Sequence, residues 1–414
     1  MKILYLAHRI PYPPNKGDKI RSYHQLRFLS KRHDVDLGCL CDDVKDLQYV
    51  EALEKLCRSV CVVPRHAWKE RAQSLLRMGW RRPLSVGYFY DERLQDDVNR
   101  RLRRGRYDAV VCFSSCMAEY VFRSPLGRLL GKAAGGIPRT VMDFCDVDSD
   151  KWAQYAKESP FPWKVFYRLE SKRLAAYERT VHARFDVSVV ISQREADLFC
   201  ETLKALRRPH VVGNGVDMDY FSSENGSLLP MERDPAVVFV GAMNYHANVD
   251  GVLWFCREVW PRVRAAVPSA QFFIVGSRPS PKVLALHGKN GIQVTGFVPD
   301  VRPYLAQARC SVAPLRLARG VQNKVLEAMA MGKAVVATPQ ALEGLQVRLG
   351  HEVLCAQDPL SYAKLVIQIL KNDALRRGLE KNAREYVHAH HSWARELKKF
   401  EALIFERKEA LDDG

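Results

Sequence analysis

Short apolar runs rich in β-branched residues alternate with helix-length stretches along most of this chain, and this alternation restricts its fold more than any other feature. Predicted strands of the first half lie at residues 3–7, 35–40, 60–63, 109–113, 139–143 and 187–191. Predicted helices lie at residues 20–31, 44–56 and 163–185. The pattern predicts βαβ units in a parallel sheet, which binds ligands at the carboxyl ends of its strands.

The alternation stops near residue 215, at turn-forming residues and a polar linker, and then restarts. The second half predicts strands at 237–241, 271–275, 292–295 and 310–314, helices at 249–263 and 301–308, and three terminal helices at 360–371, 373–389 and 393–411. A chain of 414 residues exceeds what one hydrophobic core usually serves. We therefore predict an α/β protein with two Rossmann-like, doubly wound domains facing across a cleft. The domains span 1–215 and 216–392, and a terminal helix at 393–414 returns to the first.

Composition excludes several classes of protein. Apolar residues make up 47% of the chain, as in globular proteins, but no apolar run approaches the roughly 20 residues of a membrane-spanning helix. The N-terminus lacks the pattern of a signal peptide, so we expect a cytoplasmic protein. The 11 cysteines are odd in number and lie mostly in apolar patterns, which favours reduced thiols. Since no pair has a partner at zinc spacing, neither a metal nor another cofactor is expected.

The net charge of +17 could attract nucleic acid, anionic lipid or a phosphorylated substrate. No nucleic-acid-binding motif accompanies the charge, so nucleic acid is not an expected partner. The sharpest local excess lies between Arg65 and Arg82, where basic residues alternate with Trp and Leu. This stretch fits a helix at an anionic membrane surface, and it also fits a helix that packs on the core with a solvated basic face.

One local motif carries candidate chemistry. Residues 319–332 read as a loop with a glycine, a short helix ended by Gly332, and then a buried strand. Lys324 lies in the first turn of that helix, and Glu327 follows on the same face. Lys324 could bind a diphosphate while Glu327 accepts hydrogen bonds from sugar hydroxyls, although an ordinary αβ connection with solvated side chains has the same pattern.

Four segments together resemble the retaining glycosyltransferases of family four, which have the GT-B fold, over essentially the full chain. They are residues 13–19, after the first strand; 214–221, the hinge; 296–305, whose backbone holds the nucleotide base in the family; and 325–332, in which Glu327 would bind ribose. Residues 17–21, 146–149 and 319–324 are similar to the subset associated with exosortase and PEP-CTERM exopolysaccharide clusters.

The resemblance implies a function. A sugar, of the hexosyl type, would pass from a nucleotide-sugar donor bound by the second domain to a glycan or polyprenyl-linked acceptor at the first, with retention. It places the protein in the cytoplasm or peripherally on the plasma membrane. A sugar-nucleotide epimerase of the same fold and a non-catalytic GT-B scaffold at the membrane are the alternatives.

The chain departs from the family pattern around the donor. Arg319 occupies the position of the family's first glutamate, and could meet a phosphate or an acidic sugar or be a surface arginine. The family's arginine and lysine after strand 237–241 are missing, and Asn244 and His246 stand there. Lys324 at a helix N-terminus is the best replacement for their charge, with His246 as a weaker candidate.

A further departure concerns the first domain, where Cys145 takes the place of a family histidine. Asp143 or Asp146 could orient acceptor or donor hydroxyls in its stead, or could cap the helix that begins near Ser149. Asp146 and Asp148 also form an acidic pair of the metal–diphosphate type, but such pairs recur by chance.

These arguments define the predicted site. The catalytic candidates are Lys324, Glu327, Arg319, Asp143 and Asp146. The candidates for donor binding are Gly17, Asn244, His246, Phe297, Val298, Gly320, Val321, Gln322 and Asn323.

Overall fold

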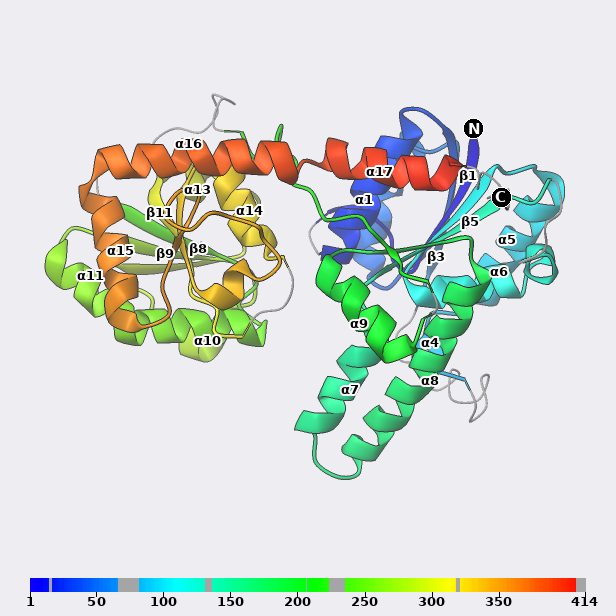
Figure 1. Ribbon diagram of the computed structural model, residues 1–414, viewed down its shortest axis with the longest axis horizontal. Helices are drawn as coiled ribbons and strands as arrows, with labels where there is room; N and C mark the ends of the chain where they lie inside the picture. Colours follow the sequence, from blue (N-terminus) through cyan, green and yellow to red (C-terminus); the bar gives the residue numbers. More distant parts are fainter. Residues whose placement is uncertain are drawn as a thin grey trace, which may run out of the picture. The chain divides into compact units, whose positions relative to one another are not determined.

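The computed structural model describes residues 1–14, 17–65, 82–130, 136–205, 207–222, 235–317 and 321–406. The chain divides into two compact units, each built around one parallel sheet (Figure 1). The first unit combines residues 1–213 with the terminal segment from Glu396 onward, and the second spans Asn214–Arg395. The fold is therefore α/β, with two Rossmann-like sheets as the alternation of patterns predicts.

The sheet of the first unit has seven parallel strands among the described residues, in the order β3-β2-β1-β4-β5-β6-β7. Its strands are β1 (Lys2–Ala7), β2 (Asp34–Cys41), β3 (Ser59–Pro64), β4 (Ala109–Phe113), β5 (Arg139–Cys145), β6 (Val187–Val190) and β7 (His210–Val211). Strands β1 and β4 are almost entirely buried, because βαβ crossovers cover both faces of a parallel sheet. The helices are α1 (Gly17–Ser30), α2 (Val50–Glu54), α4 (Leu84–Tyr88), α5 (Glu92–Arg104), α6 (Ala118–Phe122), α7 (Asp148–Glu158), α8 (Trp163–Arg184) and α9 (Gln193–Leu203).

The sheet of the second unit has six parallel strands in the described part of the chain, in the order β10-β9-β8-β11-β12-β13. Its strands are β8 (Ala236–Val240), β9 (Gln271–Val275), β10 (Ile292–Gly296), β11 (Ala308–Ala313), β12 (Ala334–Ala337) and β13 (Leu354–Cys355). Its helices are α10 (His246–Trp254), α11 (Trp260–Ala266), α12 (Pro281–Leu284), α13 (Arg302–Gln307), α14 (Asn323–Ala330), α15 (Pro359–Lys371) and α16 (Asp373–His390). A hydrophobic core of its own surrounds this sheet, separate from the core of the first unit.

The last helix, α17 (Trp393–Phe405), belongs to the first unit from Glu396 onward. The Glu401 carboxylate accepts hydrogen bonds from Arg32 and His33, both at 2.8 Å, at the end of α1. The Glu396 carboxylate accepts a hydrogen bond from the backbone N–H of Gly213 at 2.8 Å. The terminal helix thus packs back on the first unit, as the predicted fold has it.

Two predicted helices differ in detail. The helix expected at residues 249–263 is divided into α10, a π-helical turn at Phe255–Val259, and α11. Pro261 explains the division, because proline has no N–H to continue the regular hydrogen-bond pattern. The helix expected at residues 44–56 is a 3-10 turn, Val44–Tyr49, followed by the short α2.

Candidate functional site

The order of the strands identifies where each sheet is open to a ligand. In the second unit the chain builds outward from β8 through β9 to β10, and from β11 through β12 to β13 in the opposite direction. In the first unit the same reversal lies between β1 and β4. Ligands of doubly wound sheets bind at the carboxyl ends of the strands beside such a reversal. The relevant residues are therefore those directly after β8 and β11, and those after β1 and β4.

Helix α14 starts after β11, at the reversal of the second sheet. Gln322 occupies the N-cap position, and its side chain accepts no capping hydrogen bond from the backbone N–H groups of the first turn. The helix ends before Gly332, whose φ of +63° is left-handed and suits glycine. An α-helix leaves the N–H groups of its first turn without carbonyl partners, so this helix start can bind an anion.

Lys324 and Glu327 lie one turn apart on α14 and are both half-buried. The Lys324 ammonium lies 5.8 Å from the ring centroid of Phe239 on β8, and donates to Gln322 Oε1 at 3.3 Å. Burial lowers the pKa of Lys324 to about 8, against the opposing charge of Glu327. Burial also raises the pKa of Glu327 to about 7, against the opposing charge of Lys324. Shifted pKa values of this kind are typical of functional sites. The same burial that destabilises a charged side chain also strengthens its attraction to an oppositely charged ligand.

The other predicted donor residues surround the carboxyl ends of the same sheet. Asn244 and His246 are exposed in the turn after β8 and at the start of α10. The ring of Phe297 directly follows β10 and is 75% exposed, and Val298 packs partly against the core. Val321, Gln322 and Asn323 form the entry to α14 and are half-buried. Arg319 and Gly320 lie outside the described residues.

The Asn248 side chain has a structural role that its position near the start of α10 does not suggest. Asparagine often caps a helix start, but Tyr245 occupies the N-cap position of α10. The Asn248 side chain is buried and donates to the carbonyl of Ala242 at 2.9 Å. It therefore holds the turn after β8, the turn that carries Asn244.

In the first unit, a charged cluster follows β1. His8 lies directly after the strand, stacked on Phe113 of β4 at 5.8 Å, and its Nε2 lies 3.5 Å from a carboxylate oxygen of Asp18. Asp18 also accepts from Arg9 at 2.5 Å. Burial alone would raise the pKa of Asp18, but its hydrogen bonds with His8 and Arg9 outweigh burial and lower the pKa. His8 is not among the predicted site residues, although a histidine directly after the first strand and close in sequence to Gly17 is a usable signal.

Gly17 begins α1 at this same edge. A Cβ atom built on it would meet no described atom within 4 Å, so packing does not require glycine here. The neighbouring Asp18 carboxylate lies within the charged cluster. The predicted approach of a ligand to Gly17 stays a prediction.

Asp143 on β5 is 0% exposed. Its carboxylate accepts from Arg21 at 2.8 Å, from Gln25 at 2.6 Å and from the backbone N–H of Cys145 at 3.0 Å. Any effect of Asp143 on a substrate would therefore act through Arg21 or through the loop that it holds. Asp143 does not cap the following helix, because the N-cap of α7 is Val147 and has no side-chain cap.

Asp146 remains accessible at the carboxyl end of β5, with 36% of its side chain exposed. Lys151 of α7 lies 3.0 Å from both Asp146 and Asp148. Burial alone would lower the pKa of Lys151, but the two carboxylates outweigh it and raise the pKa. Among the described residues, no group of three or more His, Cys, Asp and Glu side chains could hold a metal ion.

A cavity of about 200 Å³ opens beside this ion pair. Its polar lining includes Ser114, directly after β4, and the charged Asp148 and Lys151, while Phe89, Trp152 and Tyr155 form much of its apolar wall. Ser114 has a left-handed φ of +76°, which turns the chain sharply away from the strand. The cavity combines apolar walls with a few polar groups at the reversal of the first sheet, as small-molecule sites do.

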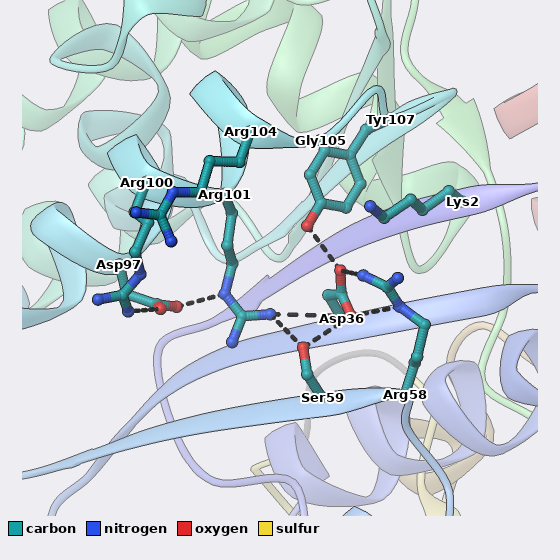
Figure 2. A pocket seen from close by; sticks show the side chains of 10 residues that line it. All are labelled: Lys2, Asp36, Arg58, Ser59, Asp97, Arg100, Arg101, Arg104, Gly105 and Tyr107. Carbon is teal, nitrogen blue, oxygen red and sulfur yellow. Dashed lines mark hydrogen bonds and ion pairs between the residues drawn. The ribbon is translucent and has the colours of Figure 1, made fainter.

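A second hollow, of about 310 Å³, lies at the amino ends of the strands of the first sheet (Figure 2). Asp36 is buried at its centre and accepts from Tyr107 at 2.6 Å, Ser59 at 2.7 Å and Arg58 at 3.0 Å. Several arginines of its lining come from the C-terminal turns of α5, where a helix favours cations. This hollow lies at the amino ends of the strands, away from the carboxyl ends where the donor or acceptor is predicted. Its two carboxylates, Asp36 and Asp97, already form ion pairs with Arg58, Arg100 and Arg101.

The predicted membrane-binding stretch is largely outside the described residues, which omit 66–81. At its ends, Arg65 is buried and lies 4.4 Å from the ring of Tyr88, whereas Arg82 forms an ion pair with Glu119. In the described part of the chain, every helix is too short or too polar to span a bilayer.

Known proteins resemble both the sequence and the fold. Residues 234–372 match the family model described as "Glycosyl transferases group 1". The chain is 25% identical over 397 residues to an "Uncharacterized 44.6 kDa protein in cps region" of Klebsiella pneumoniae, covering 93% of this chain and 95% of that protein.

Among solved structures, sucrose-phosphate synthase of Thermosynechococcus elongatus superposes with a TM-score of 0.65 at 17% identity, over 97% of this chain and 98% of the other. Alr3699/HepE of Anabaena in complex with UDP has the same TM-score at 14% identity, with 97% and 98% coverage. The two sheets and these likenesses show the GT-B fold. The segment that matches the glycosyltransferase family contains all of α14, including Lys324 and Glu327.

Proposed function

We propose that this GT-B protein transfers a sugar, of the hexosyl type, from a nucleotide-sugar donor to a glycan or lipid-linked acceptor. The transfer retains anomeric configuration and serves exopolysaccharide biosynthesis. The observation that carries the proposal is the half-buried Lys324–Glu327 pair at the start of α14, with pKa values of about 8 and about 7 beside the reversal of a parallel sheet. The family match over residues 234–372 supports the activity. The Klebsiella relative in a cps region supports the polysaccharide context.

In this proposal the second unit binds the donor. The N–H groups at the start of α14 and the Lys324 ammonium bind the diphosphate and stabilise its charge as it leaves the anomeric carbon. Glu327 accepts hydrogen bonds from the ribose hydroxyls, and the backbone at Phe297 and Val298 holds the base. Structures of the similar Anabaena protein with UDP and with UDP-glucose support a uridine nucleotide as the first donor to test.

The first unit binds the acceptor. The cavity beside Ser114 and Lys151 has the mixed lining that a sugar with an apolar carrier requires. Asp146, accessible at the rim of this region, accepts a hydrogen bond from the acceptor hydroxyl. His8 and Asp18 lie at the reversal of the sheet and orient the acceptor. We place Asp143 behind them as a positioning residue that holds Arg21 and the end of β5.

The test uses the purified full chain with UDP, GDP and their sugar derivatives. Binding should raise the melting temperature with one base, and nucleotide release should then require a glycan or lipid-linked acceptor. Lys324→Ala should lose the stabilisation, whereas Lys333→Ala is a matched control. Lys333 is also a lysine of the second unit with a lowered pKa, but it donates to the carbonyl of Ala306. Release of nucleotide without acceptor would favour the epimerase, and absence of any nucleotide binding would favour the scaffold.

A further inference from the structure

We infer that the end of the α7–α8 hairpin docks on an anionic lipid surface. Helices α7 and α8 pack as an antiparallel pair that projects from the first sheet, with their connecting turn at the far end (Figure 1). We call residues 155–173 the hairpin tip. The inference goes beyond the proposed transfer reaction, because this contact requires neither donor nor acceptor.

Large apolar side chains are exposed on the hairpin tip to an unusual degree. Phe161 in the turn is 83% exposed, and Trp163 at the start of α8 is 56% exposed. The complete set is Tyr155, Phe161, Trp163, Val165, Phe166 and Leu169. Contiguous apolar surface of this kind marks an interaction site in a folded protein.

The periodicity of α8 separates its two faces. The buried positions Glu170, Leu174 and Glu178 recur with helical spacing on the face toward the rest of the unit. Val165 and Leu169 lie on the opposite face and are exposed. Phe166 lies one turn before Glu170, in the same row as the buried positions, and is nevertheless exposed. Because the inner face already packs the helix, the outer apolar residues contribute nothing to the core. They are therefore available to a partner.

The charge of the hairpin tip identifies the partner. Its cations are Lys157, Lys164, Arg168, Lys172 and Arg173, and none has an ion-pair partner within the described residues. Against these five cations the hairpin tip contains two glutamates, Glu158 and Glu170. Glu170 is buried and accepts from the backbone N–H groups of Leu84 and Ser85 at 3.0 and 2.9 Å, so it does not offset the exposed positive charge. Aromatic residues mixed with cations suit the headgroup region of an anionic membrane.

The position of these cations in the helix supports a binding role. The first turn of α8 has no acidic residue, contains Lys164 and has no side-chain cap. Cations at a helix N-terminus oppose the helix dipole and do not stabilise the helix. An anionic surface beyond the end of α8 would remove this conflict. These cations therefore do not stabilise the fold of the unit, and binding to an anionic surface accounts for their position.

A strip of aromatic rings in contact with one another connects the hairpin tip to the cavity beside Lys151. Trp163 lies 6.3 Å from Tyr167, and Tyr167 lies 6.0 Å from Tyr155 and 5.5 Å from Trp152. Trp152 and Tyr155 also line the cavity. A membrane-docked hairpin tip would thus place an apolar path between the lipid surface and the pocket that we propose for the acceptor.

The experiment is co-sedimentation of the full chain with vesicles. One set contains phosphatidylcholine alone, and the other contains about one third phosphatidylglycerol. We expect binding to the anionic vesicles that weakens with salt. The double variant Phe161→Ser/Trp163→Ser should reduce the partition coefficient by at least about tenfold, because two rings no longer enter the interface. Lys164→Glu/Arg168→Glu should remove the preference for anionic vesicles.

Control variants keep the inference falsifiable. Leu349→Ser/Leu360→Ser removes two comparably exposed apolar side chains of the second unit and should leave vesicle binding unchanged. Circular dichroism checks that all variants keep the wild-type fold. The inference is overturned if the hairpin tip variants bind vesicles like the wild type, or if wild-type protein does not bind. It is also overturned if the tip residues instead mediate self-association in sedimentation velocity. Nucleotide binding is measured separately, so that failure of the proposed function is distinguishable.

Discussion

UDP binding should weaken steeply above pH 8 in the wild-type protein, and Lys324→Arg should abolish that dependence. Burial holds the pKa of the free Lys324 ammonium at about 8, and a bound diphosphate requires the charged form. The ammonium is then about 90% protonated at pH 7, about 10% at pH 9 and about 1% at pH 10. The dissociation constant of UDP should rise about tenfold between pH 7 and pH 9, and about tenfold more by pH 10.

Isothermal titration calorimetry of UDP between pH 7 and pH 10 tests this. The diphosphate does not titrate in the range, because the second pKa of a terminal phosphate is about 6. The uracil N3–H loses its proton above about pH 9, so wild type and variant are compared between pH 7 and pH 9, and affinity lost by both proteins above that pH is assigned to the base. Arginine stays charged throughout, so the affinity of Lys324→Arg should vary less than about twofold between pH 7 and pH 9. At pH 9 the wild type should also take up a proton on binding, which appears as a heat that depends on the buffer.

A matched variant and a clear contrary result complete the test. Lys333→Arg changes another half-buried lysine of the same unit and should keep the wild-type pH dependence. If wild type and Lys324→Arg lose affinity in parallel between pH 8 and pH 9, Lys324 is not the cation that binds the diphosphate. The assignment of the donor site to the start of α14 would then be refuted.

Two further predictions concern the first unit. Burial is the main cause that raises the pKa of Glu178 to about 8, so the folded state holds a proton that the unfolded state releases near pH 4.5, and stability falls as pH rises between these values. Glu178→Gln should remove this fall. In urea unfolding, the change that it makes to the free energy of unfolding should be more favourable at pH 8.5 than at pH 5 by about 2 to 4 kcal/mol. An equal change at both pH values would contradict the prediction. Arg21→Met should destabilise by about 3 to 5 kcal/mol because it leaves the fully buried Asp143 charge unpaired. In the same unfolding assay Arg21→Met/Asp143→Asn should cost less than the sum of the single changes, and additivity would argue against the pair.

Much of the fold follows from local patterns. The strands at 3–7, 109–113 and 271–275 were predictable because each is a continuous run of apolar residues between turns. The strands β7 and β13 were not, since two residues carry no periodicity. The π-helical turn before Pro261 depends on how the helix rearranges its backbone hydrogen bonds where proline lacks an N–H. The spacing of apolar residues does not predict that rearrangement.

Some features of the candidate site could also be predicted from local sequence, whereas others depend on the tertiary structure. Lys324, Glu327 and Gly332 form one continuous segment, so the sequence alone places them on a helix between two strands. The buried Asp143 carboxylate accepts hydrogen bonds from Arg21 and Gln25, which lie more than a hundred positions away in the sequence. Only the order of the strands brings these three side chains together. The exposure of Phe161 likewise depends on α7 and α8 packing as a pair, which no local pattern specifies.

The return of α17 has a consequence for synthesis. The segment from Glu396 onward belongs to the unit built from residues 1–213, and its Glu401 carboxylate binds Arg32 and His33. Everything from Asn214 to Arg395 leaves the ribosome before that helix does. The unit that holds the first 213 residues therefore lacks part of its native contacts until α17 has been translated, and Arg32 and His33 have no Glu401 carboxylate to bind until then.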